Sequence, residues 1–180
     1  MFEYLGLILT LLSWLGIVYI LVNWRGRHDM SISMHAASAS RALLLFRVVL
    51  VLLGGVFFWW LVAWLAPELK LSTTFTSVLA LTILCQMIAG LIPDIEGWQR
   101  KVHRGAAWLM AVLYLPLSFM ILGSLEVGVL ARTIGLVCLA YMLAAGFGYL
   151  FYKRLRSKFL FFQFMYIVAF QVLILSAAYL

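Results

Sequence analysis

Residues 42–66, ALLLFRVVLVLLGGVFFWWLVAWLA, form a continuous apolar stretch whose one charged side chain is Arg47. A helix needs about 20 mainly apolar residues to cross the hydrocarbon core of a bilayer. The stretch is long enough and continuously apolar, whereas strands of a membrane barrel alternate over about 10 residues. A helix also bonds its backbone polar groups within its own segment, as lipid requires. The stretch therefore predicts a transmembrane helix.

Similar apolar stretches occur on both sides of it, at residues 4–24, 74–92, 105–122, 127–149 and 159–180. Short polar joints separate them. The first stretch ends in Arg25 and Arg27 and lacks a small-residue cleavage pattern, so we expect a retained helix and not a signal peptide. The sequence predicts a single all-α domain over residues 1–180, a bundle of six transmembrane helices with short loops.

The composition excludes a water-soluble domain. Of the 180 residues, 67% are hydrophobic and 11% are charged, and the mean hydropathy is +1.13. Soluble domains are about 45–50% apolar and about 25% charged. The net charge of +7 comes from scattered Lys and Arg and not from a nucleic-acid-binding stripe. The expected partners are membrane lipids and a further membrane protein, with no nucleic acid.

The basic residues predict the orientation. The joints at residues 25–41, 93–104 and 152–158 hold ten Lys and Arg, whereas the alternate joints hold Lys70 alone. Loops on the cytoplasmic side carry the excess of Lys and Arg. We therefore expect these three joints in the cytoplasm, both termini outside, and a location in the plasma or bacterial inner membrane.

The first two of these joints contain all three histidines. His28 and His35 lie in the first joint, and Asp94 and His103 lie in the second. Imidazole and carboxylate groups could hold a zinc ion with an open water position. Ordinary solvated or headgroup-facing loops are the alternative, and we assign no metal or cofactor. The joint is short, so Asp94 and His103 are predicted to lie close together as a candidate polar site.

Two arginines lie inside predicted spans, Arg47 near the cytoplasmic side and Arg132 near the outer side. An arginine in mid-bilayer costs at least about 2.5–3.5 kcal/mol, so each needs water, a headgroup or a partner. Each could extend to its nearer interface or belong to a polar interior. The expected partners are Asp29 or Asp94 for Arg47, and Glu68 or lipid for Arg132.

Three glutamines, Gln86, Gln163 and Gln171, also lie within predicted spans. Polar side chains at such depth usually form hydrogen bonds between helices. The pair Gly54-Gly55 is expected to allow close helix packing for lack of side chains.

A proline in the fourth span predicts a pocket. Pro116 leaves the carbonyl of Val112 without its helical donor. Ser118 or a neighbouring helix could satisfy the bent backbone. The bend would open a wedge lined by Trp108, Tyr114 and Phe119, which is a candidate pocket for a lipid tail or another apolar ligand.

The segment from 91 to 122, LIPDIEGWQRKVHRGAAWLMAVLYLPLSFMIL, has a Pro-Asp pair at the end of a span, a His before the next span, and a proline within that span. These positions are Pro93, Asp94, His103 and Pro116. The pattern resembles the six-span bacterial membrane family called domain of unknown function 998, and more loosely the DRAM-type six-span proteins. The Ser-rich joint SISMHAASAS at residues 31–40 is similar to that family's. The resemblance implies the six-span fold and no particular activity.

These observations leave three functions open. The leading hypothesis is a non-catalytic membrane protein that binds a lipid or small apolar molecule, or serves as a subunit of a membrane complex. The second is a lipid-modifying enzyme, such as a metal-dependent hydrolase, with its site at the cytoplasmic interface around Asp94 and His103. The third is a small transporter that uses Arg47, Arg132 and the glutamines.

Overall fold

The computed structural model describes residues 2–24, 28–152 and 157–180. Within these residues six helices are long and apolar enough to cross a membrane, which makes the chain a multi-pass membrane protein and confirms the all-α six-helix prediction. Five are α1 (Leu5–Asn23), α6 (Thr73–Leu91), α7 (Trp98–Leu122), α8 (Val129–Phe151) and α9 (Phe159–Tyr179). The sixth, Ser40–Glu68, joins α3 (Ser40–Arg47), η1 (Val48–Leu53), α4 (Gly54–Trp60), η2 (Leu61–Leu65) and α5 (Ala66–Glu68).

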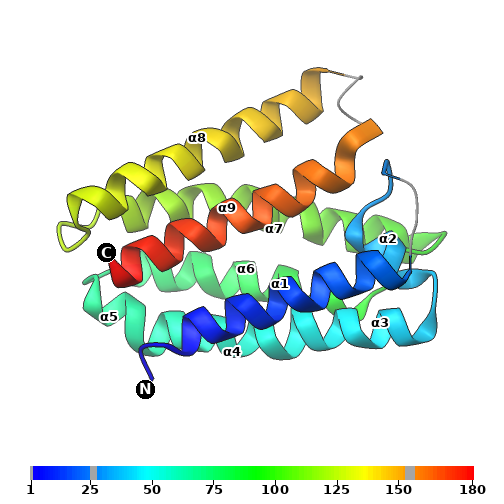
Figure 1. The fold of residues 1–180 in the computed structure, drawn as a ribbon, viewed down its shortest axis with the longest axis horizontal. Coiled ribbons are helices and arrows are strands. Elements are labelled where there is room, and N and C mark those ends of the chain that lie inside the picture. Colours follow the sequence, from blue (N-terminus) through cyan, green and yellow to red (C-terminus); the bar gives the residue numbers. More distant parts are fainter. Residues whose placement is uncertain (1, 25–27, 153–156) are drawn as a thin grey trace.

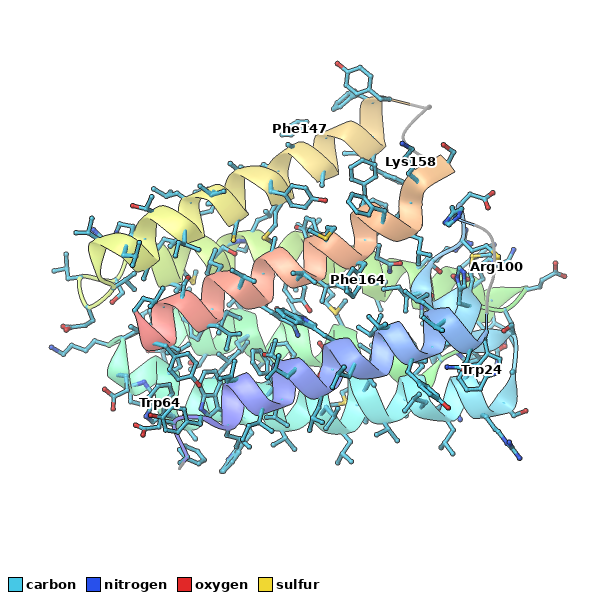
Figure 2. All side chains as sticks on the ribbon, viewed as in Figure 1. Trp24, Trp64, Arg100, Phe147, Lys158 and Phe164 are labelled. Carbon is cyan, nitrogen blue, oxygen red and sulfur yellow. The ribbon has the colours of Figure 1, made fainter. Side chains whose placement is uncertain are left out.

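Both chain termini lie at one end of the bundle, which we call the terminal end (Figure 1). The opposite end holds the short helix α2 (Ile32–Ala37) and is called the α2 end. Trp24, Arg100 and Lys158 lie at the α2 end and Trp64 at the terminal end (Figure 2). The most extensive pairings are α8 with α9 and α6 with α7, and α7 also contacts both α8 and α9.

Two boundaries differ from the sequence prediction. Helix α7 begins at Trp98, within the predicted polar joint, and not at Gly105. Gln, Arg and Lys are good helix formers, so the helix extends beyond its apolar part. The first joint contains α2, which the sequence did not predict. Ser31 caps this helix by accepting a hydrogen bond from the backbone N–H of Met34.

The second span contains two π-helical segments, η1 and η2. Within η1, the Leu50 carbonyl accepts a hydrogen bond of 2.7 Å from Nε2 of Gln86 on α6. A side chain that bonds into the backbone ladder is one cause of such irregular turns. Gly54 makes room for the amide, because a Cβ there would lie 1.9 Å from Nε2 of Gln86.

The other two glutamines also join helices, as predicted. Gln163 on α9 accepts a hydrogen bond of 2.9 Å from the backbone N–H of Ile32, which attaches α2 to α9. Gln171, also on α9, accepts a hydrogen bond from the indole of Trp14 on α1. Interhelical hydrogen bonding therefore satisfies all three intramembrane glutamines.

Arg132 has different partners from those expected. The helix α8 begins at Val129, so Arg132 lies in its first turn, and its Nη2 donates to the carbonyls of Ser124 and Val127, at 2.8 and 3.3 Å. These carbonyls lie in the preceding loop, within reach of the folded-back side chain. The partners of Nη2 are thus backbone carbonyls, where Glu68 or lipid was expected.

An ion pair joins two loops at the terminal end. Nζ of Lys70 lies 2.7 Å from the carboxylate of Glu126. Hydrogen bonding to Glu126 raises the pKa of Lys70 above its ordinary value of 10.5. The hydroxyl of Ser124 also donates to the Leu69 carbonyl at 2.7 Å. Together these contacts tie the loop before α6 to the loop before α8.

A candidate amphiphile site at the α2 end

The site begins where α6 ends. Ile92 has extended backbone angles after the last helical residue, Leu91, and Pro93 cannot donate to a helical carbonyl. Asp94 follows, and its side chain is 1% exposed. A carboxylate is rarely buried without partners. Its nearest donors are Ser31, Ser33, Arg100 and Arg104.

Two of these donors come from α2 and its cap. The hydroxyl oxygens of Ser31 and Ser33 lie 3.2 and 3.5 Å from Oδ2 of Asp94 and form a hydrogen bond of 2.8 Å with each other. Each hydroxyl has one proton, so one of them donates to the other, which in turn donates to Asp94. The other two come from the first turns of α7. Nε of Arg104 lies 3.3 Å from Oδ1 of Asp94, and Nε of Arg100 lies 3.6 Å from it. Asp94 therefore holds α2 against α7.

His103 is buried beside this cluster. Its Nδ1 lies 2.7 Å from the Ile92 carbonyl. A carbonyl can only accept, so Nδ1 carries the hydrogen and Nε2 of the neutral ring is an acceptor. The partner of the imidazole is thus a backbone carbonyl, whereas the sequence suggested Asp94. Asp94 and His103 nonetheless line the same cavity.

The other two histidines are placed apart from this arrangement. His35 is buried, and its Nδ1 lies 2.9 Å from the Ser31 carbonyl of its own helix. His28 is exposed, and its carbonyl accepts from the backbone N–H of Leu160. Over residues 2–24, 28–152 and 157–180, no three His, Cys, Asp or Glu side chains gather closely enough to hold a metal ion.

Arg47 does not join the cluster. Its Nη2 donates to the Leu91 carbonyl at 3.2 Å, where Asp29 or Asp94 was expected. The last carbonyls of a helix lack donors within the helix, and Leu91 ends α6 beside Arg47. This bond satisfies an orphan acceptor and ties the second span to α6. Neither Arg47 nor Arg132 is among the residues that line the cavity.

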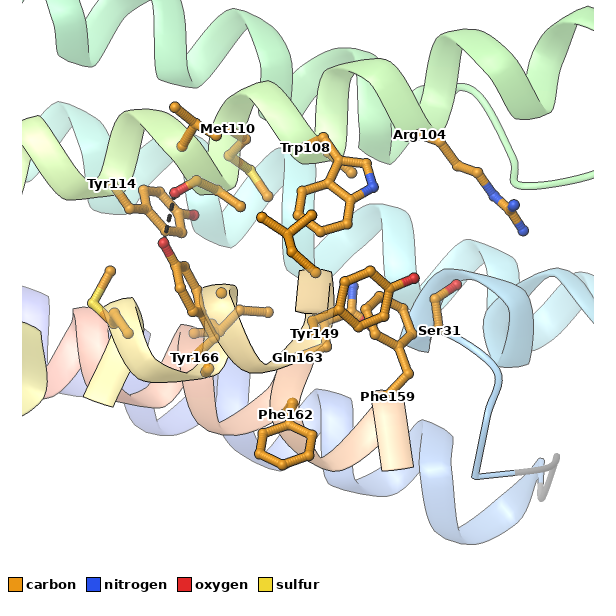
Figure 3. A pocket seen from close by; sticks show the side chains of 18 of the residues that line it. Ser31, Arg104, Trp108, Met110, Tyr114, Tyr149, Phe159, Phe162, Gln163 and Tyr166 are labelled. Carbon is orange, nitrogen blue, oxygen red and sulfur yellow. Dashed lines mark hydrogen bonds between the residues drawn. The ribbon is translucent and has the colours of Figure 1, made fainter. Parts of the chain in front are cut away.

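A cavity of about 520 Å³ extends from Asp94 into the bundle. Helices α7, α8 and α9 form its walls, and the α2 region closes its polar end. Ser31 and Arg104 lie at one end of the group of side chains in Figure 3, and Tyr114 and Tyr166 lie at the other. Polar residues at the α2 end are Asp29, Ser31, Ser33, Asp94, His103 and Arg104. The deeper lining is mainly aromatic and aliphatic.

Aromatic rings from three helices meet along the cavity wall. The ring of Tyr149 on α8 lies 5.3 Å from Trp108 on α7 and 4.8 Å from Phe159 on α9, measured between centroids. Deeper in the cavity, Tyr114 stacks on Phe170 at 3.9 Å. These are ordinary separations for interacting rings or somewhat closer, and they give the wall a rigid apolar surface.

The predicted wedge is partly realised. Trp108 and Tyr114 line the cavity. Pro116 and Phe119 are outside its lining, and Phe119 is 57% exposed, facing away from the bundle. Ser118 donates to the Tyr114 carbonyl and not to that of Val112. The cavity extends from Tyr114 toward the α2 end, whereas the wedge was expected around the proline.

Several cavity residues were missed at the sequence level. Ser31 and Ser33 belong to the Ser-rich joint, for which no site role is predicted, and Arg104 counts only toward the predicted orientation. Tyr149 and Tyr166 lie in apolar stretches with no distinguishing pattern. A polar joint before a proline-containing span is the available signal, but it does not indicate which later helices complete the wall.

Comparisons with known proteins found no relative: no family model, curated protein or solved structure matches the chain. The resemblance of residues 91–122 to the six-span family therefore stays a prediction.

Proposed function

We propose that the chain binds an amphiphile, a molecule with one polar end and one apolar chain or ring system, in the cavity between α7, α8 and α9. The observation that carries this proposal is that the lining changes from polar residues at one end of the cavity to apolar residues along the rest. Asp94, Ser31 and Arg104 form the polar end, and Trp108 and Tyr114 belong to the apolar part. Ligand sites are typically apolar cavities with a few convergent polar groups, at about 300–1,000 Å³.

The volume favours a ligand with one chain. At about 520 Å³ the cavity lies in the middle of the range typical of sites for a single small ligand, about 300–1,000 Å³. A fatty acid or a single-chain lipid fits this size. A phospholipid with two chains is far larger and would have to leave one chain outside in the bilayer.

The polar end is proposed to face the cytoplasm. The basic residues described at this end include Arg100 and Arg104, and Lys158 lies there too (Figure 2). The ten-to-one distribution of Lys and Arg between alternate joints supports the same orientation. The ligand would then enter from the inner leaflet of the plasma or inner membrane.

Native mass spectrometry of protein purified in mild detergent tests the binding proposal. We expect one amphiphile of fatty-acid size retained per chain. Gly146 lines the cavity, and a Cβ there meets no atom within 4 Å, so Gly146→Leu should project into the cavity and abolish retention. Gly105 also has open space but is outside the lining, so Gly105→Leu should retain the ligand.

Two results would contradict the proposal. The first is wild-type protein that neither retains an amphiphile nor takes up added palmitate. The second is equal retention by the Gly146→Leu and Gly105→Leu proteins.

A second candidate function is hydrolysis of an ester in the bound amphiphile. It is favoured because residues 31–33 and residues 94–104 meet at the cavity, and because Nε2 of His103 can accept a proton. Water would add to the ester carbonyl and the bond to the alcohol oxygen would break. His103 would take the proton from water and return it to the leaving alcohol.

Incubation with monopalmitoylglycerol tests this second function. We expect release of palmitate by the wild type, none by His103→Gln, and unchanged release by His28→Gln, because His28 is exposed and outside the cavity lining. Release no faster than in protein-free detergent would leave binding as the function.

A further inference from the structure

We infer that the polar end of the cavity selects an anionic oxygen head group, a carboxylate or a phosphate, through Arg104. This inference rests on the proposed amphiphile binding and specifies the ligand's head. A ligand can use only those hydrogen-bonding groups that remain available once the contacts within the protein are made.

Asp94 already has partners within the protein. It accepts from one hydroxyl of the Ser31–Ser33 pair and from Arg104, lies beside Arg100, and its side chain is 1% exposed. An ionised carboxylate accepts but does not donate. Its charge is opposed by two cations, so the cluster of Asp94, Arg100 and Arg104 has a net positive charge. Asp94 therefore orients Arg104 and is not itself the group that meets the ligand.

Arg104 has N–H donors that are not used within the protein. A guanidinium carries five N–H donors in a fixed plane. Nε donates to Asp94 at 3.3 Å, and Nη2 lies 3.7 Å from the sulfur of Met34. A thioether is a weak acceptor, so the second contact is a poor match for a charged donor. Among the described residues that line the cavity, Arg104 is also the one Lys or Arg.

The fixed guanidinium suits an oxygen anion. Arginine binds carboxylate and phosphate through paired N–H donors, and such charge-assisted hydrogen bonds are the strong ones. Fixing Nε on a buried carboxylate lowers the entropy lost when the ligand binds. His103 lies one residue earlier on α7 and also lines the cavity. Its Nε2 can accept from the P–OH of a singly ionised phosphate, whereas an ionised carboxylate offers it no proton.

One group in the lining opposes an anion. Asp29 lies in the joint before α2 and contributes to the same cavity. Asp29 and Arg104 both belong to exposed residues, so solvent and salt weaken the repulsion by the one and the attraction by the other alike. Asp29 also has a partner of its own within the protein. Arg104 differs in that its Nε is held in place by the buried carboxylate of Asp94.

The test compares four probes with the same 16-carbon chain: palmitate, hexadecyl phosphate, hexadecanol and hexadecylamine. Each is added at equal mole fraction to detergent-solubilised protein, and the bound fraction is measured by native mass spectrometry. Palmitate and hexadecyl phosphate should bind at least about tenfold more tightly than the other two. If one of these two anions binds more tightly than the other, that anion identifies the natural head group as a carboxylate or as a phosphate.

Variants assign the preference to Arg104. Arg104→Gln should reduce the preference for the anions to about twofold or less, and Arg104→Lys should keep part of it because the charge remains. Lys101→Gln is the control, since Lys101 is exposed and outside the lining. Partial loss of the preference in Arg104→Lys, against its full retention in Lys101→Gln, tests the inference even where Arg104→Gln fails to fold.

The outcomes separate the inference from the proposed function. Equal binding of hexadecanol and palmitate would overturn the anionic head and leave amphiphile binding intact. Tighter binding of hexadecylamine would mean that Asp29 or Asp94 recognises a cation, and would also overturn it. Absence of binding for all four probes, with no retained lipid, would remove the proposed function itself.

Discussion

The hydroxyl of Tyr166 on α9 donates a hydrogen bond of 2.7 Å to the backbone carbonyl of Ala111 on α7. Both residues line the deep part of the cavity, and Figure 3 shows this bond as a dashed line. Ala111 precedes Val112, whose carbonyl receives no helical hydrogen bond because Pro116 has no backbone N–H. The bond therefore joins α7, about one turn before Pro116, to α9 and fixes the distance between the two helices at the cavity.

Tyr166→Phe should destabilise the protein by about 0.5–1.5 kcal/mol, the net value of such a hydrogen bond. Tyr141→Phe is the matched control, because the Tyr141 hydroxyl is buried without a hydrogen-bond partner, and its removal should be neutral or stabilising. Reversible unfolding in mixed micelles measures both. Equal effects of the two substitutions would show that the Tyr166 hydroxyl contributes nothing specific.

Gly54→Ala should destabilise through Gln86. The new Cβ would lie 1.9 Å from Nε2 of Gln86, which must then release the Leu50 carbonyl. An unsatisfied buried amide costs about 1–3 kcal/mol. Gly105→Ala, where the space is open, should be neutral or stabilise the helix by up to about 1 kcal/mol.

A double-mutant cycle checks the cause of the Gly54 effect. In a Gln86→Ala background, Gly54→Ala should lose most of its cost, because the obstructing amide is gone. If the cost is the same in both backgrounds, the clash lies elsewhere and the role given to Gln86 is wrong.

Asp94→Asn should cost about 1–3 kcal/mol, because it weakens the charge-assisted hydrogen bond from Arg104 and removes the charge that faces Arg100 at 3.6 Å. This cost is well below that of breaking a fully buried ion pair, since Arg100 and Arg104 are partly exposed and can be hydrated. The same change should release α2 and reduce palmitate binding. Glu96→Gln on the same loop, where Glu96 is exposed, should change neither quantity. Wild-type stability and binding in the Asp94→Asn protein would contradict this role.

The sequence predicted the spans well because hydrophobic length alone determines them. Pro93 placed the end of α6 correctly, and Asp94 proved to be the centre of the polar cluster. The partners of Asp94 were harder to predict. Ser31 reaches it from more than sixty positions earlier in the chain, through a short helix that has no apolar periodicity.

The arginines inside the spans show a second limit of sequence reasoning. Charge alone suggested acidic partners for Arg47 and Arg132, but both donate to backbone carbonyls, of Leu91 and of the Ser124–Val127 loop. Such acceptors occur at every helix end and leave no trace in the side-chain pattern. Only the packing of one helix end against the next span decides which carbonyl is used.

The orientation of the bundle gives the last prediction. Both termini lie at the terminal end, opposite Arg100 and α2 (Figures 1 and 2). Cytoplasmic loops carry the excess of Lys and Arg. A reporter fused after Leu180 should therefore be active outside the membrane, and one inserted in the joint 152–158 should be active in the cytoplasm. Replacing the basic residues of that joint should weaken this preference. A cytoplasmic C-terminus would mean the opposite orientation, so that Arg104 and the polar end of the cavity would lie at the outer leaflet and the ligand would have to come from that side.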